Sequence, residues 1–255
     1  MPNVVITNDD GPTSPGLRAL LRELRGLARL LTVVPEKNMG GMGKSITLRK
    51  PIAIRELGPS FYAISGTPAD AFLIALELLR PDRPDALVSG INMGPNIGIE
   101  DLLHSGTLGA ALQAALHGVP AIAVSYAIGT GFPRPTEERM ERDLALAARL
   151  VARLLEAVLE GGLPEGVDLV SVNVPVGADE GRVLITEPLR EPFWTTTRIA
   201  DGFIHRPWGG GVPEGPPGTD IWALLNGHIA ITPIGLGLKS NKQALGELLA
   251  EAGIT

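Results

Sequence analysis

Two adjacent aspartates, Asp9 and Asp10, follow a short apolar run near the start of the chain. Residues 4–6 (Val-Val-Ile) have the composition of a buried strand, and the chain then becomes polar at residues 7–11 (Thr-Asn-Asp-Asp-Gly). Successive side chains of a strand point to opposite faces. Two neighbouring carboxylates therefore address one ligand only after the strand has ended, and Gly11 permits that turn. Because Asp-Asp-Gly is also an ordinary turn sequence, the pair alone leaves a structural role open.

A second polar segment, residues 89–96 (Ser-Gly-Ile-Asn-Met-Gly-Pro-Asn), follows the apolar run 86–88. Ligands of parallel α/β sheets bind outside the carboxyl ends of the strands, so we expect this segment and the acidic pair at the same edge. Hard divalent cations prefer carboxylate and amide oxygens. Asp9, Asp10 and Asn92 therefore form a candidate metal site.

Residues 104–107 (His-Ser-Gly-Thr) open a predicted helix. Backbone N–H groups at a helix N-terminus, together with the hydroxyls of Ser105 and Thr107, are typical of an anion site. Ser105 also suits the N-cap position, a structural role that is compatible with a phosphate contact. His104 has three interpretations: an acid, a phosphate contact or a packed side chain.

The elements that must position these residues alternate between strand and helix. The predicted strands are residues 4–6, 31–34, 61–64, 86–88, 121–124 and 169–172, and the predicted helices are residues 16–30, 67–79, 105–116 and 136–160. Residues 45–48 and 52–54 are expected to form a hairpin or a short extension. Thr67, Pro68 and Asp70 suit a helix start with an N-cap, a first-turn proline and a capping acid. The alternation predicts an α/β fold with a mostly parallel sheet and helices on both faces.

The composition changes over residues 190–220. This stretch is rich in proline and glycine and has all three tryptophans in or beside it: Pro192, Pro207, Pro213, Pro216, Pro217, Gly209–Gly211, Trp194, Trp208 and Trp222. Large aromatic residues among Pro and Gly favour an extended arm that packs on another surface. A strand is expected at residues 228–232 and a closing helix at residues 241–251.

Composition restricts the function classes. The 255 residues carry a net charge of −6, which argues against binding a nucleic-acid polymer, and they include no cysteine, which excludes disulfides and a Cys nucleophile. The start lacks a basic segment, and no apolar run reaches the roughly 18 residues of a membrane span. We expect a soluble, cytoplasmic protein with no membrane partner.

Three other phosphate-handling or hydrolytic patterns do not fit. Residues 38–45 (Asn-Met-Gly-Gly-Met-Gly-Lys-Ser) nearly match a phosphate loop, but strand-like residues follow where that motif must open a helix. A phosphoacceptor receiver needs a further Asp at the end of its third strand and a Lys after its fifth. Asp85 lies before its strand instead of at its end, so it does not fit that pattern. The sequence contains no G-x-S-x-G motif of a serine hydrolase.

Five segments in order resemble the SurE family of stationary-phase survival proteins: residues 7–11, 66–70 (Gly-Thr-Pro-Ala-Asp), 89–96, 104–107 and 231–234 (Ile-Thr-Pro-Ile). The resemblance implies a metal-dependent phosphomonoesterase that acts on nucleoside 5′- and 3′-monophosphates. Related members also cleave short polyphosphate.

The resemblance further implies a Rossmann-like core and a C-terminal β-hairpin arm exchanged between subunits, giving homodimers or homotetramers. Residues 1–255 would then be one domain, with the site in a core at 1–175 and the arm, a strand and a closing helix at 176–255. Asp9, Asp10 and Asn92 match the family's metal ligands. The residues that match its phosphate-binding region are Asn96, Ser105, Gly106 and Thr107.

One position departs from the family. Its fourth metal ligand is a serine in a pattern like Pro-Asp-x-x-x-Ser-Gly, whereas residues 35–41 here read Pro-Glu-Lys-Asn-Met-Gly-Gly. Gly40 stands at the serine's position and offers no side-chain oxygen. A water can fill that position, because Mg²⁺ commonly keeps several waters. The departure bears on metal affinity, metal preference and activity.

The expected mechanism is hydrolysis by a metal-activated water, with one Mg²⁺ or Mn²⁺ per subunit on Asp9, Asp10 and Asn92. The helix start at residues 105–107, with Asn96, would stabilise charge on the phosphate oxygens. Either aspartate could accept the water's proton, and His104 is a candidate leaving-group acid.

Two rival hypotheses remain. Asp9 could be a covalent nucleophile, although the usual Asp-x-Asp pattern and later Lys are not apparent. The chain could also be a non-catalytic metal- or nucleotide-binding homologue, an interpretation that Gly40 alone favours.

Overall fold

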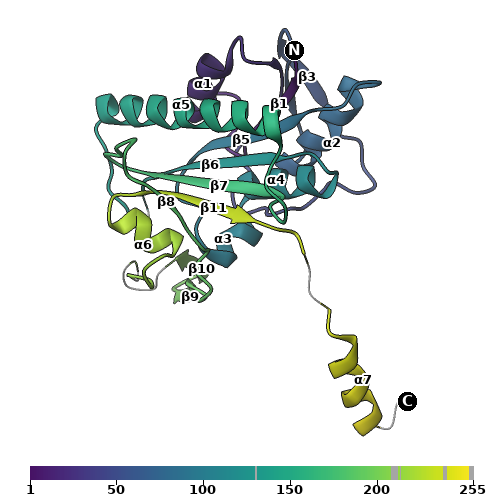
Figure 1. The fold of residues 1–255 in the computed structure, drawn as a ribbon, viewed down its shortest axis with the longest axis vertical. Helices are drawn as coiled ribbons and strands as arrows, with labels where there is room; N and C mark the ends of the chain where they lie inside the picture. Colours follow the sequence, from purple (N-terminus) through teal and green to yellow (C-terminus); the bar gives the residue numbers. More distant parts are fainter. Residues whose placement is uncertain (130, 208–211, 213, 238–239, 253–255) are drawn as a thin grey trace.

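The structure, a computed structural model, describes residues 1–129, 131–207, 212, 214–237 and 240–252. In this part of the chain, nine strands form one sheet in the order β3-β4-β2-β1-β5-β6-β7-β11-β8, and β9 pairs with β10 separately (Figure 1). The strands are β1 (Asn3–Thr7), β2 (Arg29–Pro35), β3 (Ile54–Gly58), β4 (Phe61–Ile64), β5 (Ala86–Met93), β6 (Ala121–Ala127), β7 (Leu169–Pro175), β8 (Val183–Ile185), β9 (Trp194–Ile199), β10 (Gly202–Pro207) and β11 (Ile229–Ile234). The helices are α1 (Pro15–Leu24), α2 (Pro68–Leu79), α3 (Gly98–His104), α4 (Gly106–Leu116), α5 (Glu137–Gly161), α6 (Asp220–Leu225) and α7 (Lys242–Glu251).

The sheet is mostly parallel, as the sequence predicts. Strands β4, β2, β1, β5, β6 and β7 all run parallel, while β3 and β11 add antiparallel to β4 and β7. The chain builds β1, β2 and β4 outward and then returns to place β5 on the other side of β1. The strand order therefore reverses between β1 and β5, the place where open α/β sheets bind ligands.

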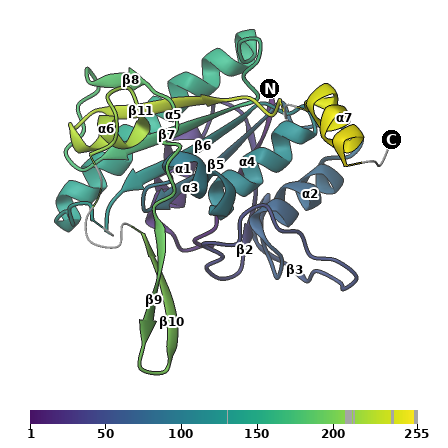
Figure 2. The ribbon, with the colours of Figure 1, turned by 90° about the horizontal axis from the view of Figure 1, so that it is seen from below.

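Helices cover both faces of the sheet (Figures 1 and 2). Leu20 of α1 and Leu155 of α5 are fully buried in the apolar cluster on one face, and Phe72 of α2 and Leu108 of α4 lie in the cluster on the other. Burying a side chain of this size contributes about 1.5–3 kcal/mol relative to exposing it. Two packed layers on the sheet thus give β1 and β5 a rigid support.

The helix start predicted at Thr67 is confirmed. The Thr67 hydroxyl accepts the Asp70 N–H at 3.1 Å, and the Asp70 carboxylate accepts the Thr67 N–H at 2.9 Å, which completes a capping box. The same carboxylate accepts the Thr47 N–H at 3.0 Å. Residues 45–48 form no strand, so they make no hairpin with residues 52–54: the backbone of this segment bonds to the helix cap instead.

The helix predicted over residues 16–30 is too long. It ends at Leu24, because Gly26 turns the chain at a φ of +96° and Arg29 already pairs with Asn3 of β1. The strand predicted over residues 86–88 continues to Met93. Two short helices, α3 and α6, were not predicted.

The arm predicted over residues 190–220 contains the β9–β10 hairpin, which projects away from the sheet (Figure 2). Trp208, Gly209–Gly211 and Pro213 lie outside the described residues. Helix α7 follows β11 and stands away from the rest of the chain (Figure 1), with none of its residues buried. Across the described residues, no helix has both the length and the apolar character needed to cross a membrane.

Candidate active site

The segment after β1 is folded into a tight turn by Asn8. The Asn8 side chain accepts the Gly11 N–H at 3.1 Å and donates to the Gly11 carbonyl at 2.9 Å, and Gly11 has a φ of +96°. This closed turn ends the strand at Thr7 and presents Asp9 and Asp10 at the carboxyl edge of the sheet.

Asp9 is the buried member of the acidic pair, with 3% of its surface exposed. Its carboxylate accepts the Thr107 hydroxyl at 2.6 Å, and its carbonyl accepts the Met39 N–H at 2.7 Å. Burial raises the pKa of the Asp9 carboxyl above its ordinary value. Hydrogen bonds, chiefly from the Thr107 hydroxyl, oppose that rise. The side chain is therefore held in one position, but burial makes its ionised form less favourable than it is in water.

Asp10 joins the loop after β2 to the end of β5. Its carboxylate accepts the Asn38 amide at 3.1 Å through one oxygen and the Met93 N–H at 3.2 Å through the other. Burial, and then the neighbouring charge of Asp9, raise the pKa of Asp10 to about 6. Two desolvated carboxylates side by side favour a positive charge between them.

Asn92 owes its position to an irregularity in β5. The pairing with β6 shifts register between Ser89 and Asn92. Gly90 has a φ of +133°, and a Cβ there would lie 2.2 Å from the Val124 carbonyl oxygen, so only glycine fits. Such a bulge re-aims the side chains that follow it. The Asn92 amide donates to the Gly94 carbonyl at 2.9 Å, and among the described residues no donor contacts its side-chain oxygen.

Asn96 is held by three hydrogen bonds from two residues that the motif analysis did not identify. Its N–H donates to the Asn173 side-chain oxygen at 2.9 Å, and its carbonyl accepts the Asn173 amide at 2.8 Å. Its own amide donates to the Ser125 hydroxyl at 2.9 Å. Asn173 is fully buried on β7, so this strand fixes the backbone of a candidate phosphate contact.

The start of α4 lies directly against Asp9. A Cβ added at Gly106 would lie 2.8 Å from the Asp9 Cβ and 3.0 Å from the Met39 carbonyl oxygen, so glycine is required by this close approach. The Ser105 hydroxyl caps the helix by accepting the Leu108 N–H at 3.2 Å. The Thr107 hydroxyl donates to the Asp9 carboxylate, so this side chain contacts the acidic pair directly.

His104 is the last residue of α3 and is exposed. Its carbonyl accepts the Gly43 N–H at 2.7 Å, which ties α3 to the glycine-rich loop, and its ring meets the Trp194 ring edge-to-face at 6.4 Å between centroids. The loop continues without a helix after Ser45, which confirms that it is not a phosphate loop of the nucleotide-triphosphate type.

Gly40 is exposed in the same loop. Its N–H donates to the Asn38 side-chain oxygen at 3.0 Å. A Cβ added there would meet only that oxygen, at 3.2 Å, so the position has room for a side chain. Lack of space therefore does not account for glycine at this position.

The donor set suits a hard divalent cation. Asp9 and Asp10 follow β1 and Asn92 lies near the end of β5, and carboxylate and amide oxygens are the ligands that such a cation prefers. In the described ranges no group of three or more His, Cys, Asp and Glu side chains could hold a metal. A cation here would depend on Asn92 and water as well as the acidic pair.

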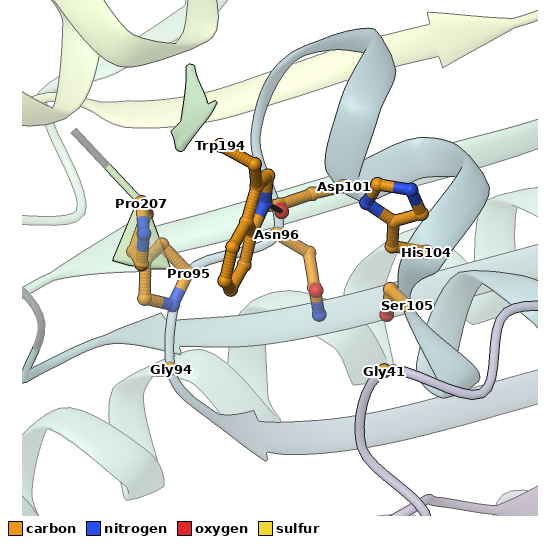
Figure 3. Close-up of a pocket in the computed structure, with 9 residues that line it drawn as sticks. All are labelled: Gly41, Gly94, Pro95, Asn96, Asp101, His104, Ser105, Trp194 and Pro207. Atoms are coloured by element: carbon orange, nitrogen blue, oxygen red, sulfur yellow. Dashed lines mark hydrogen bonds between the residues drawn. The ribbon is translucent and has the colours of Figure 1, made fainter. Parts of the chain in front are cut away.

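A hollow of about 200 Å³ opens between the segment after β5 and the start of α4, and Asp9, Asp10 and Asn92 are not among the residues that line it (Figure 3). Its walls come from the β5–α3 segment, the end of α3, the glycine-rich loop and the hairpin: Gly94, Pro95, Asn96, Asp101, His104, Ser105, Gly41, Trp194 and Pro207. Figure 3 shows the Trp194 ring beside the Asn96 side chain, with Ser105 near Gly41. The site thus has a polar side at the sheet edge and an aromatic side at the hairpin.

The fold and this arrangement define an α/β protein with a cluster of polar side chains at the strand-order reversal of a mostly parallel sheet. Comparisons with known proteins identify the family. The family model described as "Survival protein SurE" matches residues 4–195, and the chain belongs to the SurE family.

Named relatives agree with this assignment. A protein named 5′-nucleotidase SurE from Methanocella arvoryzae is 38% identical over 95% of each chain. Another of that name from Thermofilum pendens is 40% identical over 91% of this chain and 90% of its own. The crystal structure of the Sure protein from Aquifex aeolicus superposes with a TM-score of 0.79 at 30% identity, covering 98% of this chain and 100% of that one.

Proposed function

We propose that this chain is a metal-dependent phosphatase that hydrolyses nucleoside 5′- and 3′-monophosphates to nucleoside and phosphate. The observation that carries the proposal is the acidic pair, Asp9 and Asp10, held beside Asn92 and the start of α4 at the strand-order reversal. Relatives that carry the name 5′-nucleotidase support the substrate class. Short polyphosphate is a second substrate that we propose from the family resemblance.

Asp9, Asp10 and Asn92 would hold one Mg²⁺ or Mn²⁺ per subunit. A bound cation supplies charge neutralisation at the phosphate and lowers the pKa of water. Thr107 keeps Asp9 in place, while Asn38 and the Met93 N–H keep Asp10 in place. Because these contacts hold both carboxylates in place, little reorganisation would be needed when substrate binds.

The chain's other residues bind and orient the phosphate. Asn96 and Ser105 line the hollow at its polar side, and the N-terminal end of α4 adds a favourable dipole. The oxygen of water bonds to phosphorus, the ester P–O bond breaks, and the nucleoside oxygen leaves with a proton. One of the two aspartates accepts the water's proton, and His104 is the candidate donor to the leaving oxygen.

We also propose that the enzyme works as a homo-oligomer, a dimer or tetramer with the C-terminal arm exchanged between subunits. Helix α7 supports this proposal. It exposes Leu245 and Leu248, at 55% and 60% of their surface, and has no buried residue. Apolar side chains on an isolated helix favour docking onto a second copy of the chain.

The direct test is phosphate release from a panel of nucleoside 5′- and 3′-monophosphates in Mg²⁺ and in Mn²⁺. We expect release from at least one nucleotide at a rate well above that of an Asp9→Ala variant that remains folded. If wild-type protein that is folded by circular dichroism releases no phosphate from any nucleotide in either metal, the proposed function is wrong.

The second candidate function is a non-catalytic metal- or nucleotide-binding protein, and Gly40 is the observation that favours it. Gly40→Ser tests it, because a serine fits the available space and restores the oxygen at that position. If wild type is inactive and Gly40→Ser is active, the binding function holds for this chain. If wild type is active and Gly40→Ser only tightens metal affinity, water fills that position and the enzyme function holds.

A further inference from the structure

The aromatic side of the hollow is built by the hairpin. A second hollow, of about 330 Å³, adjoins the first and shares Gly41, His104 and Trp194 with it. His205 of β10 completes its wall. Small-molecule sites have volumes of roughly 300–1,000 Å³ and combine apolar walls with a few polar groups, and the joined hollows match that description.

Trp194 is held rigidly although it lies at the start of an exposed strand. Its indole N–H donates to the Asp101 carboxylate at 3.0 Å, and its backbone N–H donates to the Glu100 carboxylate at 2.9 Å. The His104 ring contacts it edge-to-face, with an interplanar angle of 81°. The side chain nevertheless keeps 38% of its surface exposed.

This combination suits a stacking platform. An indole that is fixed by hydrogen bonds loses little conformational freedom when a second ring packs on it, so stacking is not offset by ordering. Every nucleobase has a π-face, and aromatic side chains bind bases through it without needing a particular base. Pro95 and Pro207 line the same hollow and extend the apolar surface next to the ring.

We propose that Trp194 stacks the base of the nucleotide while Asn96 and Ser105 contact its phosphate. The proposal rests on the proposed nucleotidase function and adds the specificity residue that separates nucleotides from other phosphate esters. The hairpin thus supplies part of the substrate site, and its contacts with Glu100 and Asp101 set the position of that part.

The experiment compares 5′-AMP with ribose 5-phosphate, which keeps the sugar and phosphate but lacks the base. We measure kcat/KM for both substrates in wild type, Trp194→Leu and Trp194→Phe. In Trp194→Leu, kcat/KM for 5′-AMP should fall about tenfold through KM, and the value for ribose 5-phosphate should stay within about twofold. Trp194→Phe should recover most of the 5′-AMP value, because it keeps an aromatic face and loses only the hydrogen bond to Asp101.

The matched control is Phe203→Leu, which removes an aromatic ring that is 69% exposed on β10 of the same hairpin and lines neither hollow. It should leave both substrates unchanged. If Trp194→Leu lowers both substrates equally, or neither, the base-stacking proposal is overturned even though hydrolysis persists. A change in oligomeric state alone would show that Trp194 serves contact between copies. Loss of the proposed function itself is distinct, since wild type would then hydrolyse neither substrate.

Discussion

The sheet edge and the β9–β10 hairpin contribute to one hollow but are built in opposite ways. At the sheet edge, Asp9, Asn96 and Thr107 are buried, and each contacts partners on other elements. The hairpin is exposed along nearly its whole length and is tied to α3 at its base, where Glu100 and Asp101 bind Trp194. We propose that the rigid edge carries the reaction chemistry and that the exposed arm carries substrate recognition.

The largest effect on phosphate release is expected at Gly106, where the sheet edge has the least space for a side chain. Gly106→Ala places a methyl group 2.8 Å from the Asp9 Cβ, so Asp9 or the start of α4 must move. Because small displacements of catalytic groups reduce rates strongly, phosphate release should fall about 100-fold or more. Gly161→Ala, at the end of α5 with open space around it, is the matched control and should keep full activity. Unchanged turnover in Gly106→Ala would contradict the assumed rigidity.

A smaller effect is expected at Asn173, which supports the edge from β7. Asn173→Ala removes both hydrogen bonds to the Asn96 backbone, so kcat/KM should fall about tenfold and inhibition by inorganic phosphate should weaken. Thr186→Val removes a buried hydrogen bond to Thr232 far from the site and should lower stability without changing these constants. If Asn173→Ala and Thr186→Val change kcat/KM and phosphate inhibition equally, Asn173 has only a structural role.

Asp101, the residue that anchors the hairpin, should make stability depend on pH. Burial raises the pKa of its carboxyl from 3.8 to about 6, so the folded chain binds this proton more tightly than the unfolded chain does. Protonation of Asp101 therefore stabilises the folded chain fully below about pH 4, and this stabilisation is lost as the pH rises to about 6. The loss lowers the free energy of unfolding by up to about 3 kcal/mol. Urea unfolding of Asp101→Asn between pH 4 and 7 should show a flatter profile than wild type.

The control for that profile is Asp201→Asn, which removes an exposed carboxylate between β9 and β10. Wild type and Asp101→Asn profiles of identical slope would contradict the assignment of this pH dependence to Asp101.

The smallest effect on the folded chain is expected in α7, which contributes no buried residue. Leu248→Glu should change the free energy of unfolding of a single chain by no more than about 0.5 kcal/mol, yet lower the mass of the assembly measured by light scattering. Gln243→Glu adds the same charge to the helix without removing an apolar side chain and should keep the assembly intact. A wild type that is already monomeric would refute the proposed role of α7.

Local patterns predicted the elements whose signals lie within a few residues. The strand at residues 61–64 and the helix that begins after Thr67 match the structure, because a short apolar run and a capping box are local properties. Helix α3 follows Ile97, which offers no side-chain cap, so its start has no such signal. Helix α6 does have a cap at Thr219, but the surrounding Pro and Gly residues favoured an irregular arm.

The residues of the candidate site also fall into two groups, those with a local sequence signal and those without one. Asp9, Asp10 and Asn92 stand in short motifs near strand ends, so sequence spacing and the sheet-edge rule predict that they lie at one edge of the sheet. Asn173 lies 77 residues from its partner Asn96, and Trp194 lies 93 residues from Asp101. No local pattern links such pairs, and only the folded sheet and hairpin place them in contact.

The central claim is that the acidic pair holds a divalent cation on which phosphate release depends. The most direct measurement follows phosphate release from 5′-AMP in Mg²⁺, after addition of a chelator, and after Mg²⁺ is restored in excess, for wild type and Asp10→Asn. We predict that the chelator abolishes wild-type release, that Mg²⁺ restores it, and that Asp10→Asn is inactive throughout. Release that continues unchanged in the chelator, or that survives in Asp10→Asn at the wild-type rate, would contradict the account.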